Sequence, residues 1–395
     1  EQLLTKDMPL VIEALKDTDS IDIEKLRYTQ LKGRDNYLCL NKLLRMRLTD
    51  KPTWTEGRLI SKVLVWLRNT ITGDKSELNL GSRGASAVWG RLSAQGSSLC
   101  KGINGACFLR SARDKASSSH LVITNHSLLM ADIASDGSVL PDYDILIIDE
   151  AHHLEDSATR QLGFELNGNN INDHLSQVIA EKGALHTGLK LFKENKLSLS
   201  RIQTLRKILS DISEYIPKAR EYTASLLSSI EKVGSETQNN SSYNTNIIPD
   251  IRITSGIRSQ PAWSEIEIDW QKIDLALDKV GDLLNDAVAA LDDTNHDACD
   301  RVLDEVVDLI QSNQELRGHL EEFVIHPSKD GVYWVSNVSS NRSSRERNIS
   351  IQSAPLYVGD VLSESIYSKT STVCLLYTSD AADDTPCVDL GGRRI

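Results

Sequence analysis

Ile145-Leu146-Ile147-Ile148-Asp149-Glu150-Ala151-His152 is the stretch of sequence that decides the fold class. Four branched aliphatic residues in a row are typical of a short parallel strand that is buried on both faces. Two adjacent carboxylates follow, at the strand end where functional groups of α/β folds gather. Side chains alternate along a strand, so a turn after Ile148 must redirect one carboxylate if both are to reach one ligand. The stretch therefore predicts a parallel α/β sheet with a site at its edge.

The two carboxylates and the histidine suit nucleotide hydrolysis. That reaction needs one carboxylate to hold Mg²⁺ and a second to orient or deprotonate the attacking water. On this interpretation Asp149 holds the metal of Mg-ATP, Glu150 is the catalytic base, and His152 senses the nucleotide state. An Asp-Glu pair alone is a common polar strand end. The whole box after an apolar strand is far more specific, and it resembles the Walker B motif of helicases with an Asp-Glu-Ala-His box.

The flanking segments narrow this resemblance to one family. They are 31–39 (LKGRDNYLC), Cys107 with 112–116 (ARDKA), 124–129 (TNHSLL), 140–141 (LP) and 153–156 (HLED). Together they resemble the DinG/XPD family of iron-sulfur DNA helicases, with specific motifs to about residue 165 and domain order alone to about 373. The resemblance implies an α/β P-loop motor domain with a parallel sheet, a small iron-sulfur insertion and an all-helical arch.

Apolar periodicity agrees with this division of the chain. A second short strand is expected at 121–123, and helical stripes are expected over 202–216, 270–288 and 302–323. Strand-like segments return at 332–335 and 349–351. We therefore expect part of motor domain 1 at 1–155 with the insertion at about 32–115, a helical arch-like domain at 156–326, and a return to motor domain 1 at 327–373.

The cysteines are candidate ligands for a metal cluster. In the resembling family four cysteines hold a [4Fe-4S] cluster, and Cys39 and Cys107 match its first and last ligands. Only Cys100 lies between them, so three of four ligands are expected. Thiolates are the natural ligands of iron-sulfur clusters. The alternative is that the cluster is lost and these thiols are small buried hydrophobic residues, as we expect for Cys299.

Candidate DNA contacts come from the same motifs. Lys32 and Arg34 flank a glycine in the segment leading to Cys39, and two such cations suit phosphate contact, although a solvated turn is the common alternative. Asn125 and His126 follow the 121–123 strand and match the family's Asn-His pair, near the motor cleft or the DNA path. The formal net charge of −12 does not decide the partner, because a basic channel can lie on an acidic chain.

The resemblance implies coupling of ATP hydrolysis to 5′ to 3′ movement on single-stranded DNA and unwinding of forked duplex. Two alternatives stay open at this point. One is an RNA helicase with the same box, and the other is a non-catalytic module that binds DNA or metal. No membrane span or secretory leader is apparent, so we expect a cytosolic protein.

Both ends of the chain suggest an internal fragment. No Gly-rich phosphate loop of the G-x-x-x-x-G-K-[ST] type occurs, and in the family that loop precedes a segment like Glu1-Gln2-Leu3-Leu4. Residues 374–395 resemble a translated sequencing adapter rather than a helicase segment. This segment begins where the resembling family has its Ser-Ala-Thr motif, so we expect that motif and the second motor domain to be absent from the chain. We expect the fragment to be inactive by itself.

Overall fold

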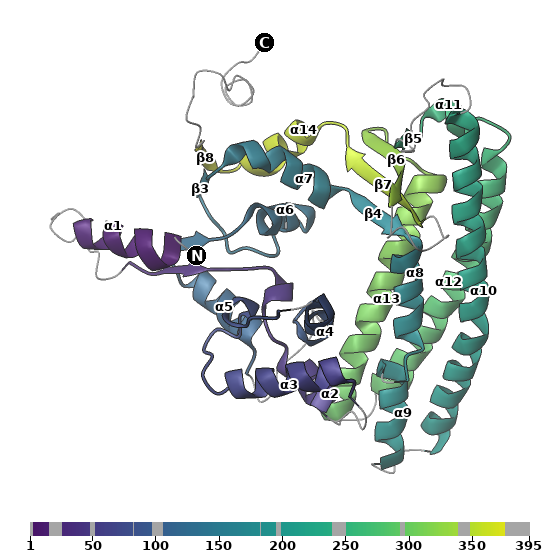
Figure 1. Cartoon of the computed structure of the whole chain (residues 1–395), viewed down its shortest axis with the longest axis horizontal. Helices are drawn as coiled ribbons and strands as arrows, with labels where there is room; N and C mark the ends of the chain where they lie inside the picture. The colour runs from purple at the N-terminus through teal and green to yellow at the C-terminus, as the bar shows by residue number, and fades with distance from the viewer. Residues whose placement is uncertain are drawn as a thin grey trace. The chain divides into compact units, whose positions relative to one another are not determined.

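The computed structural model describes residues 3–15, 26–47, 52–81, 83–96, 106–181, 183–194, 199–238, 250–292, 297–338 and 348–375. The chain divides into two compact units (Figure 1). Unit 1 contains Glu1–Gln95, Lys101–Leu162 and Tyr357–Ile395, and unit 2 contains Gly96–Cys100 and Gly163–Leu356.

Unit 1 contains two small parallel sheets. Strand β1 (Tyr28–Gln30) pairs with β2 (Leu121–Ile123), and β3 (Ile145–Ile148) pairs with β8 (Ser371–Cys374). The two predicted strands, β2 and β3, are confirmed, and each pairs in parallel with a different strand, so they lie in two small sheets rather than one. The expected burial of β3 on both faces is wrong, since the side chains of Ile145 and Ile147 are 68% and 59% exposed. Leu146 and Ile148 face a core and Ile145 and Ile147 do not, because among the described residues β3 has the single neighbour β8 and helices cover one of its faces.

The described part of unit 1 contains eight α-helices, six of which form two clusters. Their bounds are α1 (Met8–Leu15), α2 (Leu40–Arg47), α3 (Trp54–Trp66), α4 (Arg83–Leu92), α5 (Phe108–Ser117), α6 (His126–Ala134), α7 (Leu154–Leu162) and α14 (Val358–Leu362). Helices α2, α3 and α4 share a hydrophobic core within the range expected for the insertion. Helices α6, α7 and α14 pack around Ile148 in a second core, which holds the carboxyl end of β3 in place.

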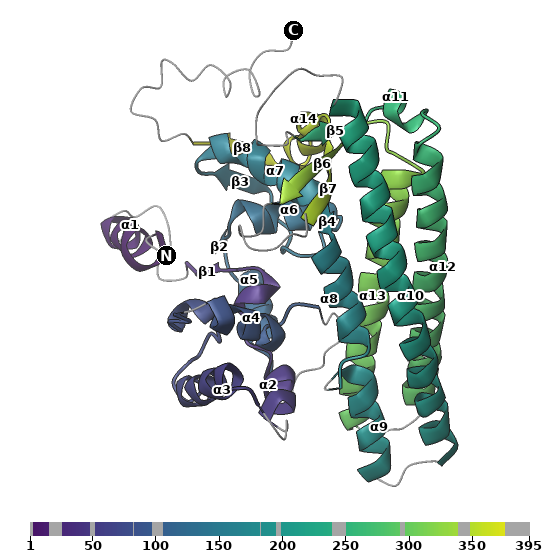
Figure 2. The same ribbon diagram turned by 45° about the vertical axis from the view of Figure 1, so that its right-hand side comes forward.

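Unit 2 is a helical bundle with a sheet at one end. It contains α8 (Gly168–Val178), α9 (Ala184–Glu194), α10 (Leu199–Gln238), α11 (Ser255–Arg258), α12 (Trp263–Asp292) and α13 (Asp297–Val324). Helices α10, α12 and α13 run side by side in both views (Figures 1 and 2). The three predicted stripes are confirmed as the faces that these helices bury against one another.

The sheet of unit 2 moves the expected domain boundaries. Its four antiparallel strands are β4 (Phe164–Asn167), β7 (Asn348–Pro355), β6 (Gly331–Val338) and β5 (Ile251–Arg252), in that order. The expectation placed β6 and β7 in the returning motor segment at 327–373, but the structure pairs them with strands of unit 2. The chain returns to unit 1 at Tyr357, and α7, expected in the arch, lies in unit 1. Strand-like patterns identify strands but not their partners, which explains the difference.

Polar contacts connect the long helices of unit 2. Asp269 on α12 accepts hydrogen bonds from the hydroxyls of Ser225 and Ser229 on α10, at 2.8 and 2.9 Å. Arg317 on α13 binds Asp274 and Asp278 on α12, both at 2.7 Å. These directional contacts add a defined register to packing that is otherwise apolar. No helix in the described part of the chain is both long and apolar enough for a membrane span.

Candidate functional site

The predicted turn lies directly after β3, at Glu150. This residue has φ 50° and ψ 49°, the left-handed conformation that a non-glycine residue adopts at a cost of about 1 kcal/mol or more. The carboxylate of Asp149 accepts a hydrogen bond from the Glu150 backbone N–H at 3.1 Å. A 3₁₀ turn over Ala151–His153 follows and leads into α7. The turn therefore breaks strand alternation at the place where two carboxylates would have to serve one ligand.

The ends of β2 and β3 are joined by His126. Its ring Nε2 donates to the backbone carbonyl oxygen of Asp149 at 2.9 Å, so Nε2 carries the hydrogen. Asn125 caps α6, because its side-chain oxygen accepts from the Leu128 backbone N–H at 3.0 Å. The structure thus brings the Asn-His pair and the Asp-Glu-Ala-His box together.

Glu150 and His152 form an exposed pair. The Glu150 carboxylate Oε2 lies 3.3 Å from His152 Nδ1, with side-chain exposures of 41% and 39%. The His152 ring also packs on His153, with 3.9 Å between ring centroids. A ligand in solvent can reach both side chains, and movement of either one would change the distance between them. The coupling role of His152 stays a prediction.

Backbone contacts with β8 complete the site's frame. The Leu375 N–H donates to the Ile148 carbonyl at 2.7 Å, and the Ala151 N–H donates to the Leu375 carbonyl at 3.1 Å. Cys374 and Leu375 belong to the segment that resembles a sequencing adapter. Residues 376–395 of that segment lie outside the described residues. Because the contacts are made by the backbone, they do not depend on side-chain identity at these two positions.

The loop before β3 is fixed by a buried carboxylate that the sequence did not single out. Asp132 on α6 is 4% exposed and accepts from the backbone N–H groups of Val139 and Leu140, both at 2.8 Å. An aspartate between apolar residues of a helix was the available signal. Burial, and then Asp132, raise the pKa of the Tyr143 hydroxyl in the same loop. Asp132 thereby positions the entry to the site.

Cys39 and Cys107 occupy equivalent local positions. Each immediately precedes a helix, α2 and α5 respectively, and each side chain is half-buried. Cys100 lies outside the described residues, so its role as a ligand beside Cys39 and Cys107 stays a prediction. Within the described residues no group of three or more His, Cys, Asp or Glu side chains is placed to hold a metal.

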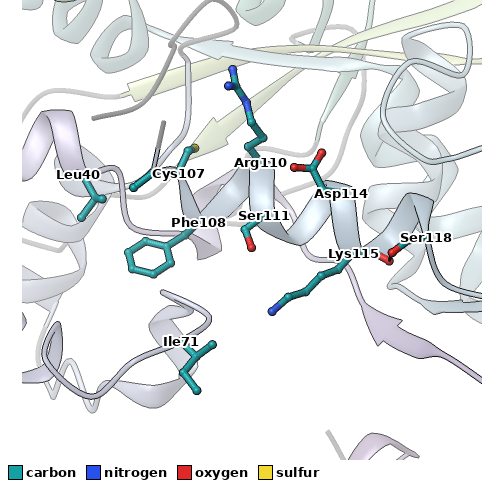
Figure 3. A pocket seen from close by; sticks show the side chains of 10 residues that line it. Leu40, Ile71, Cys107, Phe108, Arg110, Ser111, Asp114, Lys115 and Ser118 are labelled. Atoms are coloured by element: carbon teal, nitrogen blue, oxygen red, sulfur yellow. Dashed lines mark hydrogen bonds between the residues drawn. The ribbon is translucent and has the colours of Figure 1, made fainter. Parts of the chain in front are cut away.

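A cavity of about 510 Å³ lies beside α5 (Figure 3). It is lined by Leu40, Ile71, Ala106, Cys107, Phe108, Arg110, Ser111, Asp114, Lys115 and Ser118. The Phe108 ring points toward Leu40 and Ile71, on the same side of α5 as Lys115. Gly73 allows this, because at φ +65° a Cβ there would lie 2.2 Å from the Phe108 ring. Leu40, which follows Cys39, and Cys107 therefore line the same cavity.

The two predicted cations before Cys39 differ in their surroundings. The Lys32 ammonium lies 2.5 Å from Asp74 and donates to Ser76 at 3.2 Å, so it is already ion-paired. Arg34 lies near Arg113 on α5. Burial lowers the pKa of the Arg113 guanidinium, Arg34 lowers it further, and Cys107 opposes the shift. The structure therefore places Arg34, rather than Lys32, near a second cation, Arg113.

Comparison with known proteins was made over the whole sequence. No family model matches the chain. It is 34% identical over 216 residues to "3'-5' exonuclease DinG" of Bacillus subtilis, covering 54% of this chain and 22% of that protein. It is 32% identical over 184 residues to "ATP-dependent helicase DinG" of Mycobacterium tuberculosis, covering 42% and 27%.

A third relative is "ATP-dependent DNA helicase YoaA" of Haemophilus influenzae, 32% identical over 240 residues, with coverage of 57% of this chain and 36% of the relative. The chain thus spans between about a fifth and a third of the length of these relatives. Their names agree with the family that the motifs around the Asp-Glu-Ala-His box indicated. By these matches about half of the chain is similar to part of the DinG and YoaA proteins.

Proposed function

We propose that the chain is part of an ATP-dependent DNA helicase. The observation that carries this proposal is the pair Asp149 and Glu150 at the carboxyl end of a parallel strand, with the left-handed turn at Glu150. In this role Asp149 holds Mg²⁺ and Glu150 accepts a proton from the attacking water. The metal, when bound, neutralises charge on the β- and γ-phosphates of ATP.

The contacts of His126 and His152 support a coupling between nucleotide and DNA. His126 is fixed to the Asp149 carbonyl, so a shift of the box would move the start of α6. His152 is paired with Glu150, so a change in the charge around that carboxylate would alter the pair. In the proposed helicase Asn125 and His126 lie toward the DNA path. Movement along single-stranded DNA in the 5′ to 3′ direction and unwinding of forked duplex are part of the proposal and rest on the family resemblance.

The test is nucleic-acid-stimulated ATP hydrolysis by the helicase that contains this chain. We expect a single-stranded oligo(dT) to stimulate hydrolysis more than tenfold and a matched oligo(U) to stimulate it less. Preference for oligo(U) would instead support the RNA helicase. Absence of ATP hydrolysis with either polymer would contradict the proposal and favour a non-catalytic DNA- or metal-binding module.

We also propose that Cys39, Cys100 and Cys107 hold an iron-sulfur cluster. Cys39 and Cys107 supply soft thiolate ligands from adjoining segments, and both precede helix N-termini, which stabilise thiolates. Arg113 adds a positive charge near Cys107. With three cysteines, either an oxygen or nitrogen ligand would bind the fourth iron, or the cluster would contain three irons.

Iron content tests this assignment directly. Anaerobic purification should give a brown protein with iron and acid-labile sulfide, and Cys39→Ser or Cys107→Ser should lower both by more than half, because each variant removes a ligand. Cys299→Ser is the matched control, since Cys299 is buried in unit 2 and should leave the iron content unchanged. A colourless wild-type protein without iron would overturn the assignment.

A further inference from the structure

An exposed apolar and basic face lies on α3, on the side away from its core. Trp54, the first residue of the helix, is 85% exposed, and Val65 is 70% exposed. Arg58 and Ser61 lie between them, and the spacing i, i+4, i+7, i+11 places all four on one side of the helix. The opposite side is buried in the core that α3 shares with α2 and α4. We call these four residues, with Arg68 in the turn after the helix, the α3 face.

The start of the α3 face is held rigidly. Thr53 and Glu56 form a capping box in which the Thr53 hydroxyl accepts from the Glu56 N–H at 3.3 Å and the Glu56 carboxylate accepts from the Thr53 N–H at 2.8 Å. Arg91 on α4 pairs with the same carboxylate at 2.5 Å. The backbone hydrogen bond and the Arg91 contact keep the pKa of Glu56 below its ordinary value despite its burial. Trp54 is therefore exposed from a fixed helix end rather than from a frayed one.

The charge of the α3 face is positive. Arg58 and Arg68 are exposed, and among the described residues their guanidinium groups have no hydrogen-bond or ion-pair partner. The helix's acid, Glu56, is buried and paired with Arg91. Glu77, near the end of the helix, accepts hydrogen bonds from Trp66 and Thr72. Arg58 and Arg68 are thus the cations of the α3 face, while Glu77 beside the helix end keeps its negative charge because both of its hydrogen-bond donors are neutral.

An exposed indole that shares one side of a helix with two arginines matches single-stranded nucleic acid better than it matches another protein surface. Bases stack on aromatic rings while cations follow the phosphates. The α3 helix rises by about 16 Å from Trp54 to Val65, roughly the length of five stacked nucleotides. A protein interface of ordinary size needs a larger apolar core than two separated side chains supply.

We propose that the α3 face is a stacking platform for single-stranded DNA, with Trp54 under a base and Arg58 and Arg68 on phosphates. This proposal rests on the proposed DNA helicase function. It adds a DNA contact on the expected insertion, separate from the Asn125-His126 segment. None of the five residues belongs to the Asp-Glu-Ala-His box. Their replacement therefore leaves the nucleotide site intact.

Intrinsic fluorescence of the chain measures this contact. Trp54 is far more exposed than Trp89, Trp263 and Trp270, which are buried, so stacking with oligo(dT) should quench mainly Trp54. Trp54→Ala should remove most of the quenching and weaken oligo(dT) binding, measured with a fluorescently labelled oligo(dT), about tenfold. Trp54→Phe should restore most of the affinity. Arg58→Ala with Arg68→Ala should reduce the slope of log Kd against log salt concentration by about 1.4.

The matched control is Leu199→Ala. Leu199 is also the first residue of a helix and is 78% exposed, but it lies in unit 2, and its replacement should change none of these values. If oligo(dT) binds with equal affinity to wild type and Trp54→Ala, the platform is overturned although the helicase proposal stands. If Trp54→Ala instead changes the sedimentation coefficient and not the oligo(dT) affinity, the face binds a second copy and the platform is likewise overturned. Absence of DNA-stimulated ATP hydrolysis in the complete wild-type protein would instead count against the proposed function.

Discussion

In the proposed helicase, Glu150→Gln should reduce ATP hydrolysis at least 100-fold and leave ATP binding within about twofold. The amide keeps the size of the side chain but cannot accept a proton, and loss of a general base costs about 10² to 10⁴ in rate. Asp149, assigned to Mg²⁺, is unchanged in this variant, so the metal-dependent part of ATP affinity is kept. Steady-state phosphate release measures the first quantity, and equilibrium binding of a fluorescent ATP analogue measures the second.

Glu155→Gln provides the control for this experiment. Glu155 has the same side chain in the first turn of α7, five positions further on, and is exposed. Its replacement should leave ATP hydrolysis within about twofold of wild type. Hydrolysis by Glu150→Gln at a near-normal rate would refute the assignment of Glu150 as base. A parallel fall in ATP binding would show that the residue holds the nucleotide rather than activating water.

The sequence predicted the parts of the site that depend on local pattern. Short apolar strands followed by polar residues identified both β2 and β3, and their ends meet in the structure through His126 and Asp149. Helical periodicity identified the long helices of unit 2 because each buries one stripe against the others. A turn after Ile148 followed from the alternation of side chains. It appears as the left-handed conformation of Glu150.

Features that depend on distant partners were not predicted. The partner strands of β6 and β7 lie far away in the sequence, so the strand pattern did not show that they belong to unit 2. The ion pair of Lys32 with Asp74 joins residues 42 positions apart, so local sequence did not indicate it, and the DNA contact of Lys32 stays a prediction. The exposed face of α3 had a local signal, the Thr53-Glu56 capping box, which marks Trp54 as the first helical residue.

Arg258 is the other residue whose replacement should have a large effect. It ends α11, and its guanidinium carbon lies 4.9, 5.2 and 5.5 Å from the ring centroids of Trp263, Tyr333 and Phe323. Its Nη1 donates to the carbonyl oxygens of Phe323 and Val324, which end α13. The group thus joins α11, α12, α13 and β6, and it places a cation at the negative end of a helix dipole.

The neighbouring Tyr333 strengthens this arrangement. Burial, and then the hydrogen bond to Glu322, raise the pKa of the Tyr333 hydroxyl to about 12, so the phenol stays neutral at any physiological pH. Its hydroxyl donates to the Glu322 carboxylate at 2.6 Å and accepts from the Ser328 N–H at 2.8 Å. The ring is therefore fixed before Arg258 stacks on it. A fixed ring costs less conformational entropy when the contact forms.

Arg258→Ala should lower the free energy of unfolding of unit 2 by about 3 kcal/mol. The variant loses contacts with three rings and leaves two helix-end carbonyls with fewer donors, and each of these losses costs about 1 kcal/mol or more. Arg258→Met should cost about 1 to 2 kcal/mol, because the thioether still packs among the rings but donates no hydrogen bond. Urea unfolding followed by tryptophan fluorescence measures both values, since Trp263 and Trp270 are buried in unit 2.

Arg252→Ala is the control, because Arg252 is an exposed arginine on β5, and it should change stability by no more than about 0.5 kcal/mol. A loss in Arg258→Ala no larger than in Arg252→Ala would show that the aromatic contacts contribute nothing net. Equal losses in the Ala and Met variants would assign the whole effect to the hydrogen bonds at the end of α13.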